Sequence, residues 1–96
     1  MSQTATLANV AASATSVTLF AAEGDTDLVS RSVFNDSAAI LYLKYGATAS
    51  ETSYTVRIPA WGYFEFPRGR GGSIYDGVVH GIWSSATGAA RTTEVA

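Results

Sequence analysis

Apolar side chains recur at every second position in several short segments of this chain, with polar residues between them. That period places successive side chains on opposite faces of a β-strand. No amphipathic pattern extends over three helical turns. Strands are predicted over four clear segments and a weaker C-terminal one: Ser16–Phe20, Ser53–Pro59, Tyr63–Phe66, Gly77–Ser84 and Ala89–Val95. The sequence therefore predicts an all-β fold, a small antiparallel β-sandwich or barrel of about seven to eight short strands.

A hairpin is predicted over Val29–Tyr45, with its turn at Asn35, Asp36 and Ser37. These residue types favour turns because their side chains bond their own backbone. A three-residue loop is favoured over a two- or four-residue loop because it separates apolar from polar side chains more cleanly. It gathers the following residues on the core side: Val29, Val33, Leu41, Leu43 and Tyr45.

The size of the chain limits it to one domain. A chain of 96 residues buries about 65% of its unfolded surface, which supports a single modest core. Charged residues make up 15% of the chain, against about 25% in a typical domain. A surface with so few charges is weakly protected against association, so we expect part of it to be covered in an assembly.

The first fifteen residues differ from the rest in composition. Residues 1–15 are mostly Ala, Ser and Thr, with Leu7 and Val10 as their larger apolar anchors. We expect either an N-terminal arm that orders against a partner or a first strand, ahead of a single β domain over residues 16–96. Leu7 and Val10 are therefore predicted partner contacts.

Charge and composition argue against several classes of partner. The net charge of −2 gives no overall attraction to nucleic acid or to an anionic membrane. The chain has no cysteine, which excludes disulfides and thiolate metal sites and fits synthesis in a reducing cytosol. No signal peptide is evident, and no apolar run approaches the roughly 18 residues that span a bilayer.

Catalytic and metal-binding signals are weak. His80 is the only histidine, and no serine near it lies in a nucleophile elbow, so a half-buried structural histidine is favoured. Glu23, Asp25 and Asp27 alternate around Gly24 but lack the spacing and distal glutamate of a calcium loop. We therefore expect no enzyme activity, no metal and no cofactor.

Two further features point to contacts with a partner. Arg68 and Arg70 lie in a glycine-rich loop that lacks the Lys-Ser/Thr of a phosphate-binding loop, so it is either a flexible loop or a contact with a partner's carboxylates. Trp61 and Tyr63 are aromatic residues of the kind found in cores, protein interfaces and sugar-stacking sites. All four are predicted contacts.

Six segments, in this order, cover most of residues 16–94: Ser16–Leu19, Phe34–Ser37, Leu41–Ser50, Gly62–Pro67, Tyr75–Gly77 and Gly81–Arg91. Together they resemble a group of small proteins of tailed bacteriophages, some of them virion parts. The loop at residues 68–72 is longer and more basic than this resemblance leads us to expect. The resemblance implies a phage origin and a structural role in the virion, and it carries no catalytic residue.

The leading functional expectation is a capsid decoration, or cement, protein that binds the major capsid protein lattice or another virion protein. Such a protein is made in the bacterial host cytoplasm and located in the virion. It is expected to form a symmetric homo-oligomer, such as a trimer at a threefold position. The alternatives are a neck, tail or baseplate component, and a host-surface glycan-binding module that uses Trp61 or Trp83.

Overall fold

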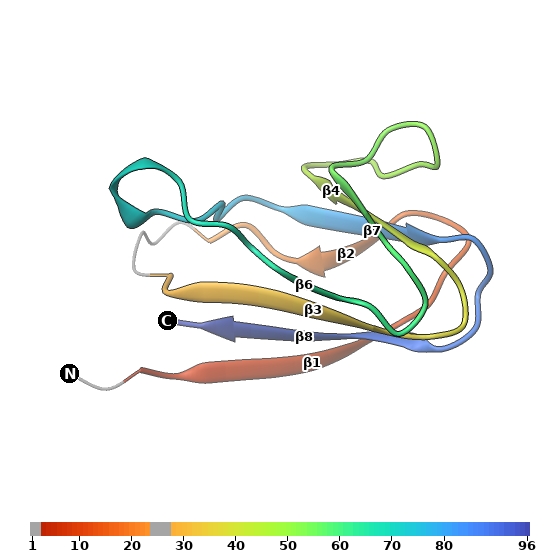
Figure 1. The fold of residues 1–96 in the computed structure, drawn as a ribbon, viewed down its shortest axis with the longest axis horizontal. Helices are drawn as coiled ribbons and strands as arrows, with labels where there is room; N and C mark the ends of the chain where they lie inside the picture. The colour runs from red at the N-terminus through yellow and green to blue at the C-terminus, as the bar shows by residue number, and fades with distance from the viewer. Residues whose placement is uncertain (1–2, 24–27) are drawn as a thin grey trace.

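The computed structural model describes residues 3–23 and 28–96, and these form eight β-strands and one short 3-10 helix. The strands make two antiparallel four-stranded sheets that lie face to face (Figure 1). The first sheet has the order β1-β8-β3-β6: β1 (Ala5–Ala11), β8 (Ala89–Val95), β3 (Ser30–Asp36) and β6 (Tyr63–Glu65). The second has the order β2-β7-β4-β5: β2 (Val17–Phe20), β7 (Val79–Trp83), β4 (Leu41–Tyr45) and β5 (Val56–Ile58). The prediction of an all-β fold is confirmed, in its sandwich form.

The predicted hairpin over Val29–Tyr45 is wrong. Its two strands are β3 and β4, and they lie in different sheets: β3 pairs with β8 and β6, whereas β4 pairs with β7 and β5. The chain therefore crosses from one sheet to the other between Asp36 and Leu41. Both arrangements point Val33, Leu41 and Leu43 into the core, because strands of facing sheets direct their apolar residues into the space between them. Residues Val33 and Leu43 are fully buried, as the hairpin also required.

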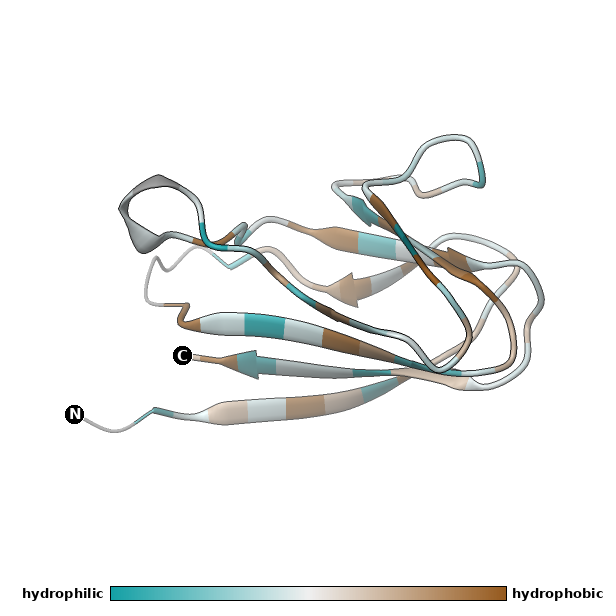
Figure 2. Cartoon of the chain, viewed as in Figure 1, coloured by the Kyte–Doolittle hydropathy of each residue, from teal (hydrophilic) through white to brown (hydrophobic). Residues whose placement is uncertain are grey.

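The hydrophobic core fills the space between the two sheets. Figure 2 shows the most hydrophobic residues spread over strands of both sheets rather than gathered in one of them. Each large apolar side chain that is fully buried stabilises the fold by about 1.5–3 kcal/mol. The buried cluster consists of Leu19, Phe20, Val33, Ala39, Leu41, Leu43, Ile58, Phe66, Val79, Trp83 and Ala90.

The C-terminal strand has a larger role than its sequence indicated. β8 was predicted as a weak last strand, yet it pairs along all seven of its residues with β1 on one side and β3 on the other. The segment Ser53–Pro59 forms a shorter strand than predicted, because β5 begins at Val56 and ends before Pro59. The carboxylates of Asp25 and Asp27 lie outside the described residues.

Candidate partner-binding surface

One broad face of the sandwich points away from the core. We call the solvent side of the first sheet the outer face. Directly opposite residues of paired strands share a face, so the register of the sheet defines it. It consists of alternate residues of each strand, beginning with Ala5 in β1, Ser30 in β3, Tyr63 in β6 and Ala89 in β8.

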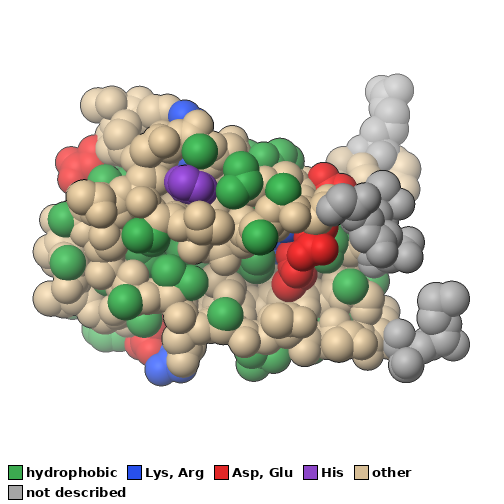
Figure 3. Space-filling view, turned by 180° about the vertical axis from the view of Figure 1, so that it is seen from behind, with side chains coloured by type: hydrophobic (Ala, Val, Ile, Leu, Met, Phe, Trp, Pro, Cys, Tyr) green, Lys and Arg blue, Asp and Glu red, His purple; other side chains and the backbone are tan. Residues whose placement is uncertain are grey.

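The outer face carries few charges. Its charged groups are Arg91, Asp36 and Glu65, and the first two form an ion pair with Arg91 Nε 2.6 Å from Asp36 Oδ2. Arg91 Nη1 also donates to Asn9 Oδ1 on β1, so this cation is held on both sides by neighbouring strands. Charged side chains are also few and scattered on the side of the molecule shown in Figure 3.

Two of the predicted contact residues lie on the outer face. Leu7 on β1 is 72% exposed and Tyr63 on β6 is 62% exposed. They occupy the two opposite edges of the same sheet, because β1 and β6 are its outermost strands. Val10 is half-buried and packs against the core from the inner side of β1, so Leu7 and Val10 face opposite ways.

Trp61 projects from the turn between β5 and β6. Its side chain is 60% exposed, and its backbone has φ +61°, the left-handed region that bulky residues avoid. Such a conformation costs about 1–3 kcal/mol and persists where neighbouring structure imposes it. Here Trp61 N donates to Ser37 O, and Gly62 N donates to Pro59 O across the same turn.

A buried amide holds that turn in place. Asn35 is fully buried near the end of β3, and its Nδ2 donates to carbonyl oxygens of the β3–β4 crossover and of the first residues of this turn. These belong to Ala39 (2.8 Å), Ile58 (3.2 Å) and Pro59 (3.0 Å). Its Oδ1 accepts hydrogen bonds from Ser37 Oγ and Trp83 Nε1. Every polar atom of the Asn35 side chain is thus satisfied, and the exposed Trp61 stands on a rigid base.

The opposite end of β3 is held by a buried cation that the sequence analysis did not single out. Arg31 is fully buried, and its Nε lies 2.8 Å from Glu94 Oε2, directly opposite on β8. Its terminal nitrogens donate to backbone carbonyl oxygens of Ala21, Tyr75, Asp76 and Gly77. The alternation of the strand could have indicated its burial, because Arg31 is two residues from Val33 and therefore lies on the same inward face.

Aromatic rings line this Arg31 site. The guanidinium carbon lies 4.8 Å from the Phe20 ring centre, within the range of a cation–π contact. Tyr45 stacks on Tyr75 with ring centres 4.4 Å apart. Burial raises the pKa of the Tyr45 hydroxyl above its ordinary value of 10.0, with Tyr75 adding to the rise and the charge of Arg31 opposing it.

The basic glycine-rich loop is closed by its own hydrogen bonds. Arg68 Nη1 donates to Gly72 O at 2.7 Å, and Arg68 Nη2 donates to Val29 O just before β3. Gly69 N donates to Ser73 O across the 3-10 helix Arg70–Gly72. The Arg68 guanidinium therefore braces this loop against the first sheet. For Arg70 the structure describes the backbone only.

His80 lies half-buried on β7 among hydroxyl groups. Its Nδ1 is 2.9 Å from Ser16 Oγ, and its Nε2 is 3.3 Å from Thr18 Oγ1. Ser16 Oγ also accepts a hydrogen bond from Ala49 N, which ties the 46–50 loop to this point. These contacts join β2, β7 and the loop, as expected of a structural histidine.

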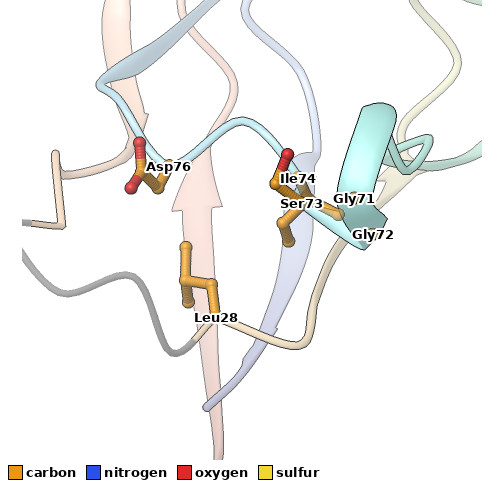
Figure 4. Close-up of a pocket in the computed structure, with 6 residues that line it drawn as sticks. All are labelled: Leu28, Gly71, Gly72, Ser73, Ile74 and Asp76. Carbon is orange, nitrogen blue, oxygen red and sulfur yellow. The ribbon is translucent and has the colours of Figure 1, made fainter.

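A shallow hollow of about 230 Å³ lies beside the glycine-rich loop (Figure 4). Leu28 and Ile74 supply its apolar wall, and Gly71, Gly72, Ser73 and Asp76 complete the lining. Asp76 is the single ionisable group among these lining residues. The lining therefore offers no pair of acid and base groups for catalysis.

Comparison with known proteins adds no relative: no family model, no curated protein and no solved structure matches this chain. Within residues 3–23 and 28–96, no helix is long and apolar enough to cross a membrane. Nor do three or more His, Asp or Glu side chains gather in that part of the chain as a metal site would require.

Proposed function

We propose that this chain is a structural protein of a tailed bacteriophage virion, and specifically a capsid decoration protein that binds the major capsid protein lattice. The observation that carries the proposal is the outer face, a four-stranded surface with three charged groups and with the exposed Leu7 and Tyr63 at its edges. The resemblance of several segments to small phage proteins supports a virion protein as the binding partner.

The physical argument rests on how such a face attaches. Interface cores are depleted of charged residues, and two of the three charges on this face already pair with each other. Attachment through this face would depend on buried area and shape rather than on charge attraction. It would therefore weaken little as salt rises, since screening acts on exposed charges.

Cryo-electron microscopy of the virions made with this chain tests the proposal. We expect density for the sandwich on the outer surface of the head, with the outer face against the capsid lattice. Density confined to the neck, tail or baseplate would exclude a decoration protein but keep a virion role. Absence of the chain from purified virions would exclude both.

A charge placed on the outer face tests the contact itself. Tyr63→Glu adds one negative charge at an exposed position of the outer face, and we expect it to reduce the copies bound per particle about tenfold. Thr52→Glu adds the same charge on an exposed loop before β5 and serves as the matched control. Equal occupancy for both variants would contradict the assigned contact face.

The strained and exposed Trp61 favours a second candidate function, a module that binds host-surface glycans by stacking on a sugar ring. Aromatic side chains held rigidly at a surface suit this role. A glycan array tests it: binding that Trp61→Ala abolishes, with the melting temperature retained, would support the glycan module. An array with no bound glycan would remove it.

A further inference from the structure

The four edges of the two sheets are not equally protected. β5 and β6 have three residues each, and Pro59 and Pro67 follow closely after them. β2 has four residues, and its register to β7 shifts between Thr18 and Phe20. Short strands, irregular register and nearby prolines are devices that stop an edge from pairing with another chain. Three edges are therefore blocked by their own geometry.

The fourth edge, β1, has none of these devices. It spans seven residues, ATLANVA, with no charge and no proline, and it pairs with β8 without any shift of register. Its inward-facing residues Thr6 and Ala8 are exposed, because the second sheet does not cover them. A long, regular, uncharged edge is a template for one more strand.

The hydrogen bonds at the ends of β1 show which backbone groups are free. Thr4 and Ala96 exchange two hydrogen bonds, of 2.7 and 2.9 Å, and Ala12 N donates to Gly88 O. Antiparallel pairing alternates, so the even-numbered residues between them also bond β8. The remaining residues point their N–H and C=O groups to the open edge: Ala5, Leu7, Asn9 and Ala11.

We propose that β1 pairs antiparallel with β1 of a second copy of this chain, about a two-fold axis at Ala8. In that register Ala5 faces the partner's Ala11 and Leu7 faces the partner's Asn9, so all four edge residues form hydrogen-bonded pairs. The two first sheets then join into one continuous eight-stranded sheet. This dimer does not depend on the virion role proposed above.

The composition of β1 selects a second copy as the occupant. Because the strand is uncharged, pairing with itself brings no like charges together. A shift of one residue would place outer-face residues opposite inward-facing ones, and a shift of two would leave either Ala11 or Ala5 beyond the partner strand. The other edges are blocked, so a closed ring of three, which needs two open edges on each copy, is disfavoured. The two-fold pair is isologous and closes on itself.

Proline at position 7 tests the role of the edge N–H groups. Leu7→Pro removes an N–H that the β1–β8 ladder does not use, whereas Leu7→Thr keeps it and changes the side chain. Size-exclusion chromatography with light scattering should give a dimer for the native chain and for Leu7→Thr. We expect Leu7→Pro to raise the dissociation constant about tenfold or more. A native chain that is a monomer or a trimer, or a Leu7→Pro dimer of native affinity, would overturn the proposal.

A single cysteine tests the position of the axis and keeps the test decisive if the proline variant fails to fold. The chain has no cysteine, and in the proposed register only position 8 faces its own copy across a non-hydrogen-bonded pair. The distance between such Cα atoms, about 4.5 Å, falls within the range of a disulfide. Ala8→Cys should form a covalent dimer under mild oxidation, at least about tenfold faster than the neighbouring inward-facing variant Thr6→Cys. Equal rates for the two variants would overturn the register.

Discussion

The two ends of β3 are attached to the neighbouring loops by different kinds of buried side chain. Arg31 and Asn35 are both fully buried on the inward face of the same strand, with Val33 between them. Each side chain reaches out of its own sheet and donates to backbone carbonyl oxygens of loops at its end of the sandwich. At one end the donor is a cation with a carboxylate partner, and at the other it is a neutral amide.

The two ends should differ in how much unfolding free energy is lost when one of their buried side chains is removed. Removing Arg31 leaves Glu94, whose side chain is 18% exposed, without its cation, and it leaves four backbone carbonyl oxygens without a donor, a combined cost of about 3–5 kcal/mol. Removing one partner of a neutral hydrogen bond leaves a dipole unsatisfied, which costs about 1–3 kcal/mol. The charged Arg31 end should therefore be the more sensitive to substitution, and the neutral Asn35 end the more tolerant.

Truncation of the cation should have the largest effect. Arg31→Ala leaves Glu94 without its guanidinium and empties a site lined by Phe20 and Phe66, so we expect a loss of about 3–5 kcal/mol in unfolding free energy. Urea denaturation followed by tryptophan fluorescence measures it. Arg31→Lys is the control: it keeps the charge but lacks the planar fork, and it should fall between the native chain and Arg31→Ala.

Truncation at the other end should cost less. Asn35→Ala removes three donated hydrogen bonds and leaves Trp83 Nε1 without its acceptor, for which we expect a loss of about 2–3 kcal/mol in the same denaturation experiment. Asp36→Ala changes the next residue, which lies on the outer face in a partly exposed ion pair, and should cost less than about 1 kcal/mol. If Asn35→Ala were more damaging than Arg31→Ala, the contrast between the two ends would be reversed.

The same two residues show how far the sequence could predict this fold. Alternation predicted the burial of Val33 and Leu43, because facing and paired strands both point inward, but the burial of Arg31 and Asn35 was not predicted. Alternation could not predict the partner of β3, which depends on strands more than fifty residues away in the case of β8. Turn-forming residues mark where a strand ends but not whether the chain returns beside it or crosses to the facing sheet.

The candidate surface could likewise be predicted only in part, because some of its features depend on residues far apart in the sequence. Leu7, Trp61 and Tyr63 are exposed, as a contact with a partner requires, and their role as contacts stays a prediction. The left-handed backbone of Trp61 was not predicted, and in the structure its N–H donates to Ser37 O, in a segment that the sequence could not place beside this turn. The open edge of β1 was equally hidden, since an edge exists only once the order of strands is known.

A smaller change at the neutral end tests whether its network acts as a unit. Ser37→Ala removes a hydroxyl that bonds Asn35 Oδ1 and the backbone of Ala39, and we expect a loss of about 1 kcal/mol. The double variant Ser37→Ala with Asn35→Ala should lose less than the sum of the two single losses, because the two side chains share a hydrogen bond. Strict additivity in urea denaturation would show that they act independently.

High pH should destabilise the Arg31 end of β3 more than the Asn35 end. The variant that tests this should change the unfolding free energy at neutral pH least of all those proposed. The Arg31 end holds Tyr45, whose pKa is raised above 10.0 chiefly by burial, whereas the side-chain network at the Asn35 end consists of Asn35, Ser37 and Trp83, none of which titrates in this range. Above pH 10.0 the unfolded chain releases the Tyr45 proton before the folded chain does. The stability that this group contributes is therefore fully present below pH 10.0 and falls as pH rises through the raised folded pKa.

Tyr45→Phe removes that titration while keeping the ring that stacks on Tyr75 and Phe66. At pH 7 we expect its unfolding free energy to lie within about 0.5 kcal/mol of the native value. Its stability should decline less steeply than that of the native chain between about pH 9 and about pH 12. This range extends from about one unit below to about two units above the ordinary tyrosine pKa. Urea denaturation at a series of pH values measures both slopes. Superimposable slopes would mean that burial of the Tyr45 hydroxyl contributes nothing to the alkaline loss, and the sensitivity of the charged end would then rest on Arg31 and Glu94 alone.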